Sequence, residues 1–96
     1  MAHVPQRWLG IVLRIVRGYY PDAELAAWGP LVEGRPSGKL ELVMVEPRDV
    51  DPDIVTDIRN DLERSDLPVP CDLRPLGDLT IPEQEEMLDR GIRIGG

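Results

Sequence analysis

The side chains that could do chemistry in this sequence are two carboxylates and one amine on predicted strands, Glu41, Asp72 and Lys39. Carboxylate oxygens are preferred ligands of magnesium and similar hard cations, so acids on neighbouring strands are where metal chemistry could occur. Lys39 stands two residues before Glu41 on one strand, so both side chains point to the same side. Lys39 could pair with either carboxylate and replace a metal ion, or it could face solvent. Glu41 and Asp72 could equally be exposed carboxylates at strand ends.

The other reactive residue types are isolated in the sequence. Cys71 has no second cysteine to pair with. Nothing near it in sequence would activate a thiolate, so we expect a small packed residue. His3 stands near the terminus and is expected on the surface. Trp8 and Trp28 are expected in the core, ahead of any role in stacking on a nucleotide.

The composition favours one globular domain over residues 1–96, with 42% hydrophobic and 30% charged residues. A net charge of −7 has the wrong sign for holding a phosphate backbone, so nucleic acid is not expected as the main partner. Arg7, Arg14 and Arg17 recur at roughly helical spacing and form either a local basic strip or a solvated helix face. The lone cysteine and the lack of a signal-like or membrane-spanning apolar run favour a cytoplasmic protein.

The elements that must position these residues begin with a helix over residues 6–16, which Gly18 should end. Its predicted buried face comprises Trp8, Ile11, Val12, Ile15 and Tyr19. Leu9, Leu13 and Val16 widen the apolar surface, as happens when a helix is covered on two sides, and a partner subunit could supply the second side.

Four strands and two further helices complete the prediction. Strands are expected over 23–28, 39–46, 67–73 and, for a residue or two, within 92–94. Pro68 and Pro70 require either that their N positions face outward from the third strand or that this strand lies at a sheet edge. Asp51 as N-cap and Pro52 as first residue begin a helix that runs to about Ser65. Thr80 and Glu83 form a capping box for a short acidic helix that ends at Gly91. This order predicts an α+β fold, a small mixed sheet with helices packed mainly on one face.

Several motifs along the chain resemble those of one known family. The first helix ends at Tyr19-Tyr20-Pro21-Asp22-Ala23, where the family has Tyr-Phe-Pro-Asp-Ala. Trp28-Gly29-Pro30, a turn over 31–33 and Gly34 match an aromatic residue, Gly-Ser, a helical turn and a glycine. Residues 38–45, 65–73 and 81–94 match its Ser-Asp-x-Asp-Leu strand, its Pro-Val-x-Val-Asp-Leu strand and its Ile-rich tail. The chain thus resembles the minimal nucleotidyltransferase domains of the DNA polymerase beta superfamily, small prokaryotic proteins often encoded beside a helical HEPN-type partner.

The resemblance implies a nucleotidyltransferase-like fold with a degenerate active site. In the family, three carboxylates hold two divalent ions that neutralise a triphosphate. The matching positions here are Lys39, Glu41 and Asp72, so the first acid has become a cation. The nucleotide-binding turn maps to Gly29, Pro30 and Gly34, and Pro30 lacks both the hydroxyl and the N–H of the family's serine. The loop over 34–39 is about two residues shorter than is usual in the family.

These departures predict a non-catalytic binding module that takes part in protein–protein interaction and needs no cofactor. It would self-associate or pair with a helical HEPN-type protein in the manner of an antitoxin. The alternative is an active metal-dependent nucleotidyltransferase that adenylylates a partner protein, using Glu41 and Asp72 with Mg²⁺ and ATP. A third possibility is a sensor that binds a nucleotide without reacting.

Overall fold

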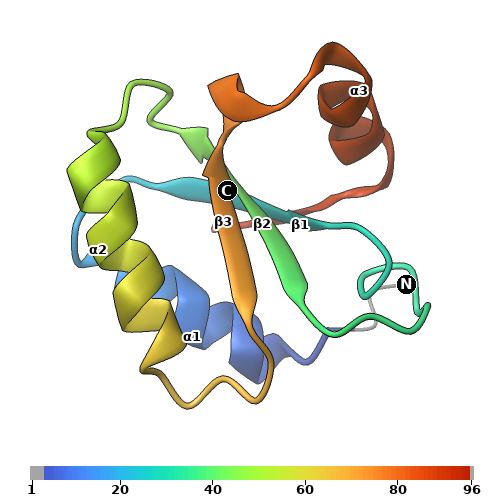
Figure 1. Ribbon diagram of the computed structural model, residues 1–96, viewed down its shortest axis with the longest axis horizontal. Helices are drawn as coiled ribbons and strands as arrows, with labels where there is room; N and C mark the ends of the chain where they lie inside the picture. Colours follow the sequence, from blue (N-terminus) through green and yellow to red (C-terminus); the bar gives the residue numbers. More distant parts are fainter. Residues whose placement is uncertain (1–3, 96) are drawn as a thin grey trace.

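A computed structural model describes residues 4–95, and His3 lies outside this range (Figure 1). The elements follow the predicted order, and they confirm an α+β protein with a small mixed sheet. They are α1 (Gln6–Arg17), β1 (Glu24–Trp28), β2 (Leu40–Glu46), α2 (Pro52–Glu63), β3 (Cys71–Pro75), the 3₁₀ turn η1 (Leu76–Asp78), α3 (Ile81–Arg90) and β4 (Ile92–Ile94). No helix within residues 4–95 is both long and apolar enough to cross a membrane.

The four strands form one sheet in the order β3-β2-β1-β4. β1 runs antiparallel to both β2 and β4, whereas β2 and β3 are parallel and α2 connects them. A parallel pair needs such a crossover, because the chain must return to the start of the neighbouring strand. The N-terminal ends of β2 and β3 therefore lie side by side at the same end of the sheet.

The alternation of side chains along β2 sorts the core into two clusters. Leu42 and Met44 belong to the larger cluster, in which α1 and α2 cover one face of the sheet. Val43 and Val45 belong to the smaller cluster on the other face, which α3 and η1 cover. Successive residues of a strand point to opposite faces, so the central strand is buried on both. Two of the three helices thus share a face, and α3 lies alone on the other (Figure 1).

The buried face of α1 differs from the predicted one. Leu9, Val12 and Val16 are buried, whereas Tyr19 is exposed and donates its hydroxyl proton to Asp61. The remaining residues of the predicted face, Trp8, Ile11 and Ile15, are only half-buried. Apolar residues occupy most positions of this helix, so two faces one residue apart, about 100° of rotation, satisfy the same spacing. Packing on the sheet and on α2 selects the face that the spacing alone left open.

The start signals of the other two helices are confirmed. Asp51 accepts a hydrogen bond from the Asp53 N–H (2.8 Å), and Pro52 is the first residue of α2. In α3 the Glu83 N–H donates to the Thr80 hydroxyl (3.3 Å) and the Thr80 N–H donates to the Glu83 carboxylate (2.9 Å), which is the predicted capping box. These caps satisfy N–H groups that have no partner inside the helix.

The third strand occupies a different range from the predicted 67–73. It begins at Cys71 and ends at Pro75, and it lies at the sheet edge as expected. Pro70 has no N–H to donate and contributes only its carbonyl, which accepts from the Leu40 N–H (2.8 Å). On the outer edge, Arg59 Nε donates to the Leu73 carbonyl (2.9 Å). Prolines and this arginine together leave β3 a poor template for another strand.

The exposed helical residue Gly10 gives a first prediction. A Cβ added at Gly10 would meet no atom within 4 Å, so alanine fits without strain. Gly10→Ala should raise the free energy of unfolding by about 0.5–1 kcal/mol, because glycine loses more backbone entropy in a helix. Urea denaturation monitored by circular dichroism measures the change. Gly91→Ala is the matched control and should destabilise, since its Cβ would collide with the Met87 carbonyl. A Gly10→Ala protein less stable than the wild type would contradict the packing described for α1.

Candidate functional site

Three of the predicted site residues meet where β2 and β3 begin, beside the end of β1. Glu41 is the register partner of Asp72 in the parallel pair and of Trp28 in the antiparallel pair. Leu42 and Leu73 point into the larger core cluster, so Glu41 and Asp72 project from the opposite face, which α3 only partly covers. The fold therefore brings the two carboxylates side by side on an accessible part of the sheet.

Lys39 forms an ion pair with Asp72, with 3.7 Å between Nζ and Oδ2. The side chains are 52% and 37% exposed, so solvent screens the pair and its contribution to stability is below about 1 kcal/mol. Its importance is positional, because an ammonium group occupies the space beside one of the two candidate ligands. Of the alternatives that the sequence left open for Lys39, pairing with a carboxylate is the one present.

The Glu41 carboxylate turns toward the end of β1. A Cβ added at Gly29 would collide with Glu41 Oε2, so the carboxylate lies directly over this glycine. Gly29 has φ 91°, a conformation that side chains disfavour. Within residues 4–95, the Glu41 carboxylate has no hydrogen-bond or ion-pair partner. Two features therefore require glycine at position 29: its positive φ, and the Glu41 carboxylate that occupies the place of a Cβ.

The turn after β1 uses its own N–H groups internally. The N–H of Glu33 donates to Gly29 and Pro30 carbonyls (3.3 and 3.1 Å), and that of Arg35 donates to Pro30 (2.9 Å). Gly34 donates to the Leu31 carbonyl (3.2 Å) and has φ 78°. The expected helical segment is therefore a single hydrogen-bonded turn. The carboxylate of Glu33 is held by Arg35 (3.2 Å) and by Arg90 of α3 (3.3 Å).

Trp28 is a core residue, as its sequence context predicted. It is 5% exposed, and the Arg74 guanidinium lies 5.8 Å from the centre of its ring. Arg74 also pairs with Glu83 (3.1 Å). Hydrogen bonds lower the pKa of Glu83, first from the Thr80 N–H and then from Arg74. The Trp28 indole N–H is buried and has no partner in the described part of the chain. The ring is already covered, so it offers no open surface on which a base could stack.

Cys71 begins β3 and packs against the larger core cluster, as expected for an inert thiol. Burial removes water from the thiolate and raises the pKa of Cys71 to about 11. At neutral pH the thiol is therefore protonated, and protonated thiols are poor nucleophiles and metal ligands. The geometry gives Cys71 a packing role.

Glu41 and Asp72 are the only carboxylates that the resemblance would supply to a metal site, and Asp72 is already paired. Among residues 4–95, no three His, Cys, Asp or Glu side chains come together in a group that could hold a metal ion. No protein-family model matches this chain, and no curated protein matches it. Two carboxylates, one of them neutralised by lysine, do not fit a centre built for two divalent ions.

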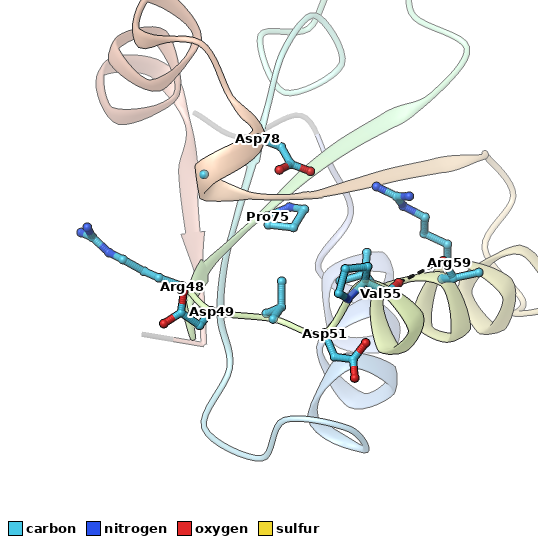
Figure 2. A pocket seen from close by; sticks show the side chains of 11 residues that line it. Arg48, Asp49, Asp51, Val55, Arg59, Pro75 and Asp78 are labelled. Carbon is cyan, nitrogen blue, oxygen red and sulfur yellow. Dashed lines mark hydrogen bonds between the residues drawn. The ribbon is translucent and has the colours of Figure 1, made fainter.

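A hollow that no sequence pattern indicated lies at the opposite ends of β2 and β3. This cavity of about 610 Å³ lies between the β2–α2 loop, the first turns of α2 and η1 (Figure 2). Val50, Val55 and Pro75 supply its apolar walls, and charges of both signs surround it. In Figure 2 the Arg48 side chain extends away from the hollow. At the start of α2, Pro52 has no N–H and the Asp53 N–H already donates to the Asp51 carboxylate, so few donors remain for an anion.

The contact between Gly29 and Glu41 gives a second prediction. Gly29→Ala should lower the free energy of unfolding by about 1–3 kcal/mol, because alanine is strained at this φ and displaces the Glu41 side chain. Gly38→Ala is the matched control in the following loop, where a Cβ would meet nothing within 4 Å. Thermal and urea unfolding of the two variants should separate them clearly. Equal stabilities would show that Glu41 does not lie over Gly29.

The raised pKa of Cys71 gives a third prediction. At pH 8 the native protein should react with iodoacetamide roughly a hundredfold more slowly than an unfolded sample, since the thiolate fraction is about a hundredfold lower. The rate should rise with pH until the pH passes about 11, because the thiolate forms only near the native pKa. Mass spectrometry of timed samples, with and without urea, provides the measurement. Native labelling as fast as unfolded labelling would contradict the burial of this thiol.

Proposed function

We propose that this chain is a non-catalytic binding module with the layout of a nucleotidyltransferase domain, which self-associates or pairs with a helical HEPN-type protein. The observation that carries the proposal is the ion pair between Lys39 and Asp72. It sits at the position where the resemblance implies a metal ion bridged by carboxylates. The partnership would be of the antitoxin type, in which one small protein restrains another by direct contact.

Electrostatics supports the loss of the metal site. One unit charge about 4 Å from another is worth about 4 kcal/mol at an effective dielectric constant of 20, and a divalent ion doubles this value. Replacing an acid by Lys39 turns that attraction into repulsion of similar size. Lys39 is 52% exposed, so solvent screens this repulsion, but its sign still opposes a divalent ion between Glu41 and Asp72. Glu41 and Asp72 would therefore bind Mg²⁺ poorly while Lys39 is charged.

The turn after β1 supports the loss of triphosphate binding. Pro30 provides neither a hydroxyl nor an N–H, and three of the next N–H groups donate to carbonyls of the same turn. The carboxylate of Glu33 adds negative charge beside this turn, although Arg35 and Arg90 balance it. A phosphate group would find few donors here. The turn persists because proline suits the first position of a helical turn.

The register between Glu41 and Asp72 favours one alternative function, an active nucleotidyltransferase that adenylylates a protein. Two neighbouring carboxylates could hold a single Mg²⁺ ion with ATP if Lys39 moved away from Asp72. The two functions differ in whether nucleotide is transferred, so a direct assay separates them. A sensor that binds ATP or GTP without reacting would differ again, because calorimetry would detect heat of binding and no label would be transferred.

The fourth prediction is that the protein transfers no label from ATP in the presence of Mg²⁺ or Mn²⁺, to itself or to the protein encoded beside it. Lys39→Asp should instead gain affinity for Mn²⁺, by at least about tenfold over the wild type in calorimetry, because repulsion becomes attraction. Arg7→Asp is the matched control, since it makes the same charge change on an exposed residue of α1, a helix that carries no acid. Its Mn²⁺ affinity should remain that of the wild type.

Two results would overturn this proposal. One is label transferred by the wild-type protein, and the other is a crystal soaked with ATP and Mg²⁺ in which metal bridges the triphosphate to Glu41 and Asp72. Equal gains of Mn²⁺ affinity in Lys39→Asp and Arg7→Asp would remove the site-specific explanation. Each outcome is independent of whether the chain associates.

A further inference from the structure

An exposed apolar and acidic surface lies on the outer side of α3. It consists of Ile81, Glu85 and Leu88, and we call it the α3 surface. Ile81 is 65% exposed and Leu88 is 71% exposed. They are seven residues apart, with Glu85 between them, so all three share one side of the helix. Met87 points the other way and is buried against the sheet.

Glu85 on the α3 surface, and Glu86 to one side of it, have no partners in the described part of the chain. Glu85 and Glu86 take part in no ion pair there, whereas Glu83 on the same helix pairs with Arg74. A single exposed leucine on a surface needs no explanation. Two exposed aliphatic residues one helical repeat apart, flanked by unpaired acids, form a patch with a definite chemistry. Its complement is a basic surface with apolar residues.

Such a complement exists on α1 of the same chain. It consists of Arg7, Gly10, Ile11 and Arg14, and we call it the α1 surface. The spacing of these residues places them on one side of the helix, away from the buried Leu9, Val12 and Val16. Arg7, Gly10 and Arg14 are exposed, and Ile11 is half-buried without packing against either core cluster of the described residues. No ion pair joins Arg7 or Arg14 to any residue in 4–95, whereas Arg17 is held by the Ala23 and Gly95 carbonyls.

The two surfaces match in shape as well as in charge. Gly10 leaves a gap in the surface of α1, since nothing lies within 4 Å of the place of its Cβ. Arg7 and Arg14 flank this gap at about one helical turn on either side. On α3, Leu88 projects and Glu85 lies about one turn away. Leu88 seated over Gly10, with the two helices antiparallel, would therefore bring Glu85 to Arg14, with ridge packed into groove.

We propose that the α3 surface of one molecule docks on the α1 surface of a second copy of this chain. α1 and α3 pack on opposite faces of the sheet, so one molecule cannot join its own two surfaces (Figure 1). The contact is head to tail, and it leaves one free surface at each end of a dimer. Such contacts continue into rings or chains. This inference rests on the proposed function as a binding module and names its partner.

The area that this contact buries is small, and the net charge of the two molecules weakens it further. A pair of single helices buries less surface than a stable interface needs, so association belongs to the weak, transient class. Each molecule also carries a net charge of −7, which opposes association outside the complementary patches. The acidic background is the reason why the α1 surface, with two unpaired arginines and no acid on its helix, is the part of a second copy that attracts α3.

The fifth prediction tests this contact by sedimentation velocity from about 10 µM to about 1 mM, the range of weak interfaces. The wild-type weight-average mass should rise with concentration and pass that of a dimer. Leu88→Glu and Gly10→Glu change exposed positions and should each remain monomeric alone. Their equimolar mixture should form a dimer that grows no further, because each variant keeps one intact surface. Asn60→Glu adds the same charge on the exposed side of α2 and should associate like the wild type.

A charge-reversed pair provides a second, independent measurement. Glu85→Arg alone and Arg14→Glu alone should each reduce association by at least about tenfold, and one chain that carries both changes should recover it. A wild-type protein that stays monomeric throughout the range overturns the proposal. So does a mixture of Leu88→Glu and Gly10→Glu that stays monomeric, which would indicate a symmetric contact. None of these variants alters Lys39 or Asp72, so a failure here leaves the labelling and Mn²⁺ assays to decide the proposed function separately.

Discussion

The parallel register between β2 and β3 is the constraint on which the rest of this structure depends. It sets Leu42 beside Leu73 in the core and Glu41 beside Asp72 on the opposite face. A shift of one residue would send Asp72 and Arg74 into the larger core cluster, which contains no charged residue. Burying an unpaired charge costs far more than any single apolar contact contributes. The hydrophobic core therefore also determines which two acids become neighbours.

The local signals in the sequence were sufficient for the helix starts and for the central strands. Asp51 with Pro52 and Thr80 with Glu83 act through contacts within three residues, so they can be read without knowing the fold. Contacts between residues close in sequence do not determine which face of α1 is buried or where β3 begins. For α1, several apolar faces were equally good until the sheet selected one. For β3, Pro68 and Pro70 have no N–H to donate to β2, so the strand begins only after them, at Cys71.

The candidate site shows the same division between local and distant information. Lys39 directly precedes β2 and Glu41 is the second residue of that strand, so their closeness follows from the sequence alone. That Asp72 lies beside them, and that Glu41 turns over Gly29, depends on pairings between residues up to about 30 positions apart. Only the resemblance to a nucleotidyltransferase suggested this grouping beforehand. The hollow beside α2 had no signal at all, since loops, a helix start and η1 build it jointly.

The last residues of the described chain close the sheet on the side of β1. β4 has three residues, yet it pairs with Leu25, Ala26 and Ala27 of a strand that is almost wholly apolar. Arg17 fastens this end by donating to the Gly95 carbonyl (2.7 Å) while also holding Ala23 ahead of β1. A chain that stopped before Ile92 would leave β1 as an open, flat and hydrophobic edge, the kind of edge that recruits strands from other molecules into aggregates. The short C-terminal strand thus acts as a cover that keeps the fold from polymerising through its backbone.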